Sequence, residues 1–153
     1  MTQTSDRIEK QILLRAPRSR VWKALTDPQQ FGEWFGCELS GPFKAGERLR
    51  GRITAKGYEH LTMDLAVERV QPETALAFRW HPYAVEVDVD YSSEPMTLVS
   101  FELEERDAGV LLKVVESGFD QIPLARRAQA FRMNDEGWAA QVKNVERYLV
   151  QAR

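Results

Sequence analysis

The stretch "EGWAAQVKNVERYL", residues 136–149, decides the fold that the rest of the chain must complete. Its large apolar residues recur at the spacing of one face of an α-helix, and they are Trp138, Val142, Val145 and Leu149. Asn134 is well placed to cap this helix, and Pro123 can open a shorter helical segment that runs to about Phe131. We therefore expect a long, interrupted C-terminal helix whose apolar face needs a second layer to pack against.

The region before this helix has the pattern of a β-sheet. Between Gly36 and Phe119, β-branched and aromatic residues form short alternating runs separated by turn residues. The expected strands are residues 7–15, 37–43, 47–55, 60–71, 75–81, 97–106 and 109–118. The links between the last six are too short for crossover connections, so we expect neighbouring strands to pair antiparallel.

Two short helices are expected between the first strand and the others. Pro17 suits a first helical turn, and Val21 and Leu25 fall on one face of the helix that follows. Asp27 can cap the second helix, with Pro28 at its first position. The order of elements predicts an α+β fold with the helices on one side of the sheet.

Composition favours a single domain of residues 1–153 in a cytoplasmic protein. The chain is 43% hydrophobic, which suffices for one core, and no segment approaches the ~20 apolar residues that cross a bilayer. A polar N-terminus without the apolar run of a secretory signal and a lone cysteine, Cys37, favour a reducing compartment. The formal charge of −2, with both signs scattered, argues against nucleic acid or a membrane as partner.

Four stretches resemble a known superfamily. They are "APRSRVWKALTDPQQFGEWF" (16–35), "VQPETALAFRW" (70–80), "VVESGF" (114–119) and the helix quoted above. They are similar to the START-like, or SRPBCC, helix-grip proteins, and within them to the branch related to the C-terminal domain of the activator of the Hsp90 ATPase. The resemblance implies a curved seven-strand antiparallel sheet that grips the long helix, with a cavity for an apolar ligand between them in many members. It implies no single activity, because members include lipid carriers, hormone receptors, polyketide cyclases and chaperone partners.

Alternation along the strands predicts which side chains face the helix. Val110, Leu112 and Val114 form an apolar row, and one further step adds Glu116 to it. The inward rows of two other strands are Val99, Phe101 and Leu103, and Leu76, Phe78 and Trp80. Arg79 and His81 then face outward, which argues against His81 as a base in the cavity.

Glu116 has two interpretations, because a carboxylate in an apolar wall is costly to bury without a partner. In the functional one it anchors a ligand or acts as a general acid or base, and it is the only catalytic candidate. In the structural one it is hydrated near the strand end or paired with an arginine such as Arg132. The sequence leaves both open.

The residues expected to line the cavity share an inward position or an aromatic ring. They are Trp34, Met63, Phe78, Trp80, Phe101, Val114, Glu116, Phe131 and Trp138. The aromatic ones can instead simply fill a core. Tyr83 and Arg132 are further candidate anchors for a ligand. Gly137 would permit close approach of the helix to the sheet. The acidic segment 86–95 is expected to extend an edge of the sheet or to cover the cavity mouth.

No cofactor or metal is expected. Glu86, Asp88 and Asp90 are spaced like calcium ligands, but Tyr91 stands where that loop requires glycine. Nucleophile-elbow, P-loop and dinucleotide motifs are absent from the sequence. We therefore expect a protein that binds a small apolar or aromatic ligand. The alternatives are a cyclase-type or hydrolase-type enzyme that uses Glu116, or a chaperone partner that uses its outer surface; the sequence leaves the oligomeric state open.

Overall fold

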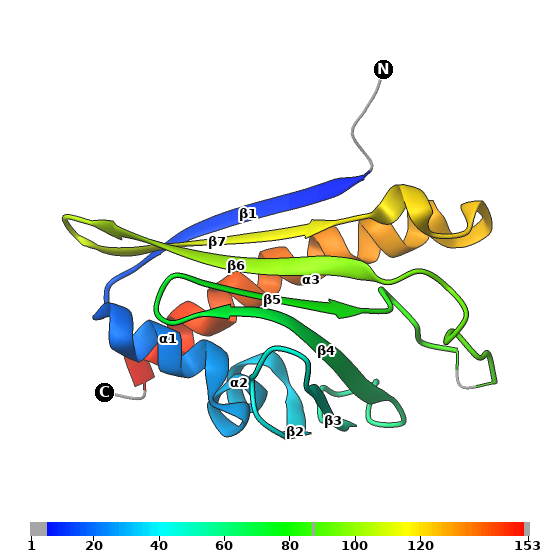
Figure 1. Cartoon of the computed structure of the whole chain (residues 1–153), viewed down its shortest axis with the longest axis horizontal. Coiled ribbons are helices and arrows are strands. Elements are labelled where there is room, and N and C mark those ends of the chain that lie inside the picture. Colours follow the sequence, from blue (N-terminus) through cyan, green and yellow to red (C-terminus); the bar gives the residue numbers. More distant parts are fainter. Residues whose placement is uncertain (1–5, 87, 152–153) are drawn as a thin grey trace.

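The computed structural model describes residues 6–86 and 88–151 (Figure 1). Its elements are β1 (Arg7–Leu14), α1 (Arg18–Thr26), α2 (Pro28–Phe35), β2 (Cys37–Ser40), β3 (Arg48–Ile53), β4 (Thr62–Gln71), β5 (Ala75–Trp80), β6 (Thr97–Arg106), β7 (Gly109–Ser117), a 3-10 turn η1 (Phe119–Gln121) and α3 (Leu124–Gln151). The α+β fold, the strands and the two short helices after the first strand are confirmed.

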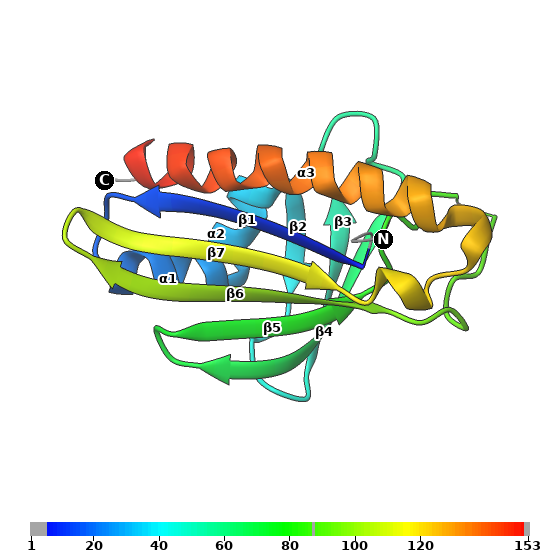
Figure 2. The same cartoon turned by 90° about the horizontal axis from the view of Figure 1, so that it is seen from above.

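The strands form one antiparallel sheet in the order β1-β7-β6-β5-β4-β3-β2. The sheet is strongly curved, since Figure 2 shows β2 and β3 running at a steep angle to β1, β7 and β6. The helix α3 runs lengthwise along the sheet in both views (Figures 1 and 2). This is the helix-grip arrangement that the resemblance implies.

The predicted inward rows are confirmed. Val110, Leu112 and Val114 are buried on β7, as are Val99, Phe101 and Leu103 on β6. On β5, Leu76 and Phe78 are buried, while Arg79 points outward and pairs with Glu68 across the strand pair at 2.7 Å. Alternating polarity therefore sets which face of the sheet meets the helices.

Aromatic rings fill the centre of the space between the sheet and α3. Phe31 from α2 lies edge-on to Phe78 of β5 at 6.5 Å, and Phe101 of β6 meets Trp138 of α3 at 5.8 Å, both between ring centroids. Trp34 contacts Phe101 at 6.4 Å, and its indole N–H donates to the Ala24 carbonyl at 2.8 Å. Edge-to-face contacts of this kind stabilise a closely packed core.

The C-terminal helix differs from the expectation, because α3 is one continuous helix of 28 residues. Asn134 lies inside it and does not cap a second segment, since its side chain donates to Glu116. An asparagine inside a helix costs only about 0.7 kcal/mol, which the buried face of the helix offsets. In residues 6–86 and 88–151, no helix has the length and apolar character needed to span a bilayer.

One strand is also shorter than expected. The segment predicted at 37–43 ends as a strand at Ser40, because Gly41 adopts a left-handed φ of 114°. Pro42 follows and has no N–H to donate to a neighbouring strand. The remaining strand boundaries lie close to the expected ones.

Cys37 provides a test of how well this core excludes water. Burial raises the pKa of its thiol to about 12, whereas an unfolded cysteine ionises near pH 8.5. Above about pH 9 the unfolded chain therefore loses a proton that the folded chain keeps, and the free energy of unfolding should fall as the pH rises. Urea unfolding at pH 8 and pH 10 should show a larger loss for the wild type than for Cys37→Val. Equal losses in the two proteins would contradict the prediction.

Candidate functional site

The carboxylate of Glu116 is fully buried on the inner face of β7. The indole N–H groups of Trp80 and Trp138 donate to its two oxygens, each at 2.8 Å. The Thr97 hydroxyl donates to Oε2 at 2.5 Å, and the Asn134 amide donates to both oxygens, at 3.0 and 3.1 Å. Neutral donors from β5, β6 and α3 thus converge on one carboxylate of β7.

This arrangement differs from the two environments considered for Glu116 in the structural interpretation. The side chain is not hydrated at a strand end, since none of it is exposed. Arg132 lies on the exposed side of α3 and is not among its partners. Among residues 6–86 and 88–151, Glu116 has hydrogen-bond donors and no cationic partner, and a buried charge without a cation requires such donors.

Two of the four donors were missed from the sequence, although a signal for each exists. Thr97 continues the inward row of Val99 and Phe101 by one step, and it pairs directly with Trp80 in the β5–β6 register. Asn134 lies four residues before Trp138, so both side chains fall on the same face of α3. Strand alternation extended by two residues and helical spacing extended by one turn would have placed both side chains near Glu116.

Most residues predicted to line a cavity belong to the closed core. The cavity left among four of these residues has a volume of about 0 Å³; they are Trp34, Phe101, Val114 and Trp138. Phe78 is fully buried as well. Phe131 packs on Phe119 at 5.2 Å between ring centroids, away from that cluster. The aromatic rows therefore fill the middle of the space between sheet and helix and leave no room there for a ligand.

An open cleft of about 700 Å³ lies at the end of the sheet. It forms because β5 ends at Trp80 while β4 continues beyond the last pair, Ala66 with Arg79. Segment 81–95 then diverges from β4 (Figure 1), and residues of both line the cleft. Of the residues predicted for the cavity, Met63 and Trp80 line this cleft, and so does the candidate anchor Tyr83.

A smaller niche of about 120 Å³ adjoins the cleft, and Phe35, Trp80 and Asn134 line both. Trp80 stacks on Trp138 with 5.7 Å between ring centroids and 27° between planes. Gly137 borders the niche, and a Cβ built on it would meet no atom within 4 Å. The prediction that Gly137 permits close approach to the sheet is therefore wrong, because the space beside it is open.

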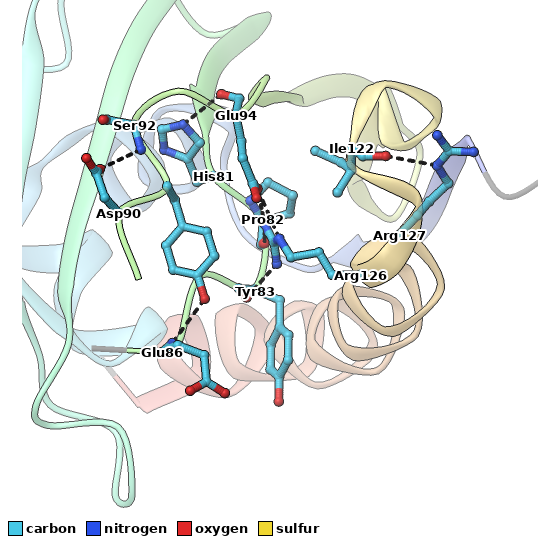
Figure 3. A network of polar contacts seen from close by, with 11 residues as sticks. His81, Pro82, Tyr83, Glu86, Asp90, Ser92, Glu94, Ile122, Arg126 and Arg127 are labelled. Carbon is cyan, nitrogen blue, oxygen red and sulfur yellow. Dashed lines mark hydrogen bonds and ion pairs between the residues drawn. The ribbon is translucent and has the colours of Figure 1, made fainter. Parts of the chain in front are cut away.

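Arg126 of α3 holds the wall of the cleft formed by segment 81–95 (Figure 3). Its guanidinium donates to the carbonyls of Tyr83 and Pro82 and to the Glu94 carboxylate, each at 3.0 Å. It also lies 4.7 Å from the ring centroid of Tyr91, a cation–π contact. Both side chains of the Arg126–Glu94 ion pair are less than one-fifth exposed, so solvent screens this pair less than a surface pair.

The wall has an unusual backbone conformation next to this clamp. Tyr83 has a left-handed φ of 47°, which costs energy for a residue with a large side chain. His81 is near the same point, with Nε2 3.1 Å from the Glu94 carbonyl. In the described residues this segment forms a loop, so of the two roles considered for residues 86–95, the extra edge strand is not seen. Across the described ranges, no three His, Cys, Asp or Glu side chains group as metal ligands.

Replacing Glu116 tests how much the buried network stabilises the fold. In Glu116→Gln the amide nitrogen must face one of the two indole N–H groups, which can only donate, so one donor loses its partner. We expect the free energy of unfolding to fall by about 1–3 kcal/mol in urea denaturation. Glu146→Gln, at an exposed position of α3, is the matched control and should change the free energy of unfolding by less than about 0.5 kcal/mol. A Glu116→Gln protein as stable as the wild type would contradict this role.

Replacing Arg126 tests whether it holds the cleft wall. Arg126→Gln loses the bonds to Pro82, Tyr83 and Glu94, so amide hydrogen exchange in residues 81–95 should speed up at least about tenfold while the sheet keeps its protection. The neighbouring Arg127→Gln removes only a bond to the Ile122 carbonyl and should leave segment 81–95 unchanged. Equal exchange rates in both variants would argue against a clamp.

Comparison with known proteins agrees with this architecture. DynU16, a protein in the dynemicin biosynthetic locus, is 27% identical over 97% of this chain with a TM-score of 0.73. This chain spans only 48% of the length of DynU16. Protein MLL2253 from Mesorhizobium loti is 21% identical, with a TM-score of 0.76 and 96% and 98% of the two chains covered. Protein NE0264 from Nitrosomonas europaea is 16% identical, with a TM-score of 0.75 and 99% and 98% covered. The last two likenesses show the fold alone.

No curated protein matches the sequence at a significant level. Residues 15–150 do match a family, described as activator of Hsp90 ATPase homolog 1-like protein. That range includes the inward rows, the Glu116 network and the cleft, and it leaves out residues 1–14, which contain β1, and residues 151–153. The chain therefore belongs to the family of activator of Hsp90 ATPase homolog 1-like proteins, within the START-like superfamily.

Proposed function

We propose that the protein binds a small, largely apolar ligand in the cleft between β4 and segment 81–95, with an aromatic part of the ligand in the niche beside Gly137. The observation that carries the proposal is the continuity of the two spaces. Phe35, Trp80 and Asn134 line both, so one molecule can occupy the cleft and reach the niche. Small-molecule sites are usually pockets of several hundred Å³ that combine apolar and polar groups, and this cleft has both, with Met63 and Trp80 beside Arg48 and Asp64.

The walls of the cleft are preorganised for binding by hydrogen bonds and ring stacking. Trp80 is held from behind by Glu116 and by stacking on Trp138, so its ring keeps one orientation. The opposite wall is held by Arg126. A site whose walls are already ordered loses little conformational entropy when the ligand enters. DynU16 lies in a biosynthetic locus, which favours a small molecule as the ligand here too.

The two alternatives lack a comparable observation. For Glu116 to act as acid or base it would have to reach a ligand, whereas its oxygens already accept from four side chains and none of its surface is exposed. We propose that it positions Trp80 and Asn134 and takes no part in chemistry. Partnership with a chaperone is suggested by the family description, and it stays a prediction that co-purification can test.

Filling the niche tests the proposal with little risk to the fold. The side chain of Gly137→Leu would enter open space, and leucine favours the helix by about 0.8 kcal/mol over glycine. β-Naphthol at about ten times its Kd should raise the melting temperature of the wild type by about 3–6 °C. In Gly137→Leu that shift should disappear while the unliganded protein stays at least as stable.

Ala140→Leu is the matched control, because Ala140 is exposed on the same helix and lines neither space. It should keep the full ligand-induced shift. The proposal is overturned if β-naphthol leaves the wild-type melting temperature unchanged at saturating concentration. It is also overturned if Gly137→Leu responds like the control.

A further inference from the structure

Asn134 lies where the cleft meets the niche, and its side-chain amide has only one workable orientation. Nδ2 donates to both oxygens of Glu116. The flipped amide would place Oδ1 against a carboxylate that already accepts from two donor-only indoles, so acceptor would face acceptor. The buried carboxylate therefore determines which end of Asn134 is turned away from it, namely Oδ1.

The Asn134 oxygen is the acceptor that this junction presents to a ligand. Across residues 6–86 and 88–151, no group donates a hydrogen bond to Oδ1. The other amide that lines the niche, Gln141, is satisfied at both ends: it donates to the Phe35 carbonyl at 2.9 Å and accepts from Asn144 at 3.0 Å. Because Asn134 is half-buried next to open space, a ligand hydroxyl can donate to Oδ1 in place of water.

Charge around the niche selects against anions. Its lining residues are Phe35, Trp80, Asn134, Gly137, Trp138 and Gln141, and none is charged. The Glu116 carboxylate lies directly behind Trp80, Asn134 and Trp138, and its hydrogen-bond partners are all neutral. A ligand carboxylate here would meet both a carbonyl oxygen and an uncompensated negative charge, whereas a hydroxyl would donate to that oxygen.

The shape of the niche matches a flat ring. Phe35 and Trp80 present their rings to it, with 6.0 Å between centroids and 62° between planes. Its volume of about 120 Å³ is close to that of the apolar cavities of about 150 Å³ that admit benzene. One aromatic ring therefore fits the niche, and the remainder of a larger molecule would extend into the cleft.

We infer that the ligand is a neutral aromatic alcohol of the phenol type, and that Asn134 is the residue that selects it by accepting the ligand hydroxyl at Oδ1. The ring lies against Phe35 and Trp80, and the Glu116 carboxylate keeps Asn134 in the accepting orientation. This inference rests on the proposed function, because it requires the cleft and niche to bind a ligand at all.

Three probes of nearly equal size separate the parts of this inference. β-Naphthol carries the donor, β-naphthyl methyl ether replaces it with an acceptor, and β-naphthoate carries a negative charge. By isothermal titration calorimetry on the wild-type chain, we expect the methyl ether to bind roughly tenfold more weakly than β-naphthol. That difference in affinity corresponds to the free energy of about one hydrogen bond. β-Naphthoate should bind more weakly still. This comparison needs no variant, so it does not depend on how a substitution folds.

Asn134→Leu keeps the size of the side chain and removes the acceptor. It should bind β-naphthol and its methyl ether equally well, whereas the exposed Gln129→Leu on the same helix should keep the roughly tenfold preference. Equal affinities of the two probes in the wild type, or an unchanged preference in Asn134→Leu, would overturn the role of Asn134 while leaving the proposed cleft intact. Binding of none of the three probes would overturn both.

Discussion

The structure depends on one buried carboxylate that has no cation to balance it. Moving a carboxylate out of water costs several kcal/mol, and that cost is offset only where hydrogen-bond donors surround both oxygens. For Glu116 the donors come from β5, β6 and α3, so each element must take a definite position before the charge is satisfied. Because Asn134 and Trp138 both donate, sliding or rotating α3 on the sheet would break the hydrogen bonds of both residues at once. The network thus sets the register of the helix on the sheet, which apolar packing alone specifies less strictly.

The aromatic core then determines where a ligand can be held. In a helix-grip fold the space between sheet and helix is available either for packing or for a cavity. Here Phe31, Phe78 and Phe101 are each at most 1% exposed and meet one another or a tryptophan edge to face, so packing uses the middle of that space. Open volume is left where β5 stops at Trp80 and the chain departs from the sheet. In this chain the end of β5 at Trp80 therefore places the available site at the end of the sheet.

Local patterns allowed most of the fold and part of the site to be predicted. Period-two alternation placed Glu116 on the inner face correctly, because a strand has only two faces. The same pattern could not tell a cavity from a core, since Phe78 and Phe101 face inward in either case. Asn134 was taken for a helix cap because asparagine favours caps, and only its tertiary contact with Glu116 explains its place inside α3. The cleft depends on how segment 81–95 leaves the sheet, and no periodicity encodes that path.

The two walls of the cleft are held by different physical means. Trp80 and Asn134 are fixed by the buried carboxylate, which also accepts from Trp138 of α3. Segment 81–95 is fixed mainly through one side chain, Arg126, whose bonds go to backbone carbonyls and to Glu94. Backbone carbonyls are present whatever side chains the segment carries, so Tyr83 or Tyr91 could be replaced with the Pro82 and Tyr83 carbonyl bonds retained. A scaffold built this way can alter the ligand it accepts by substitutions in the loop while the polar anchor under Trp80 stays the same, which is how one fold comes to serve unrelated functions.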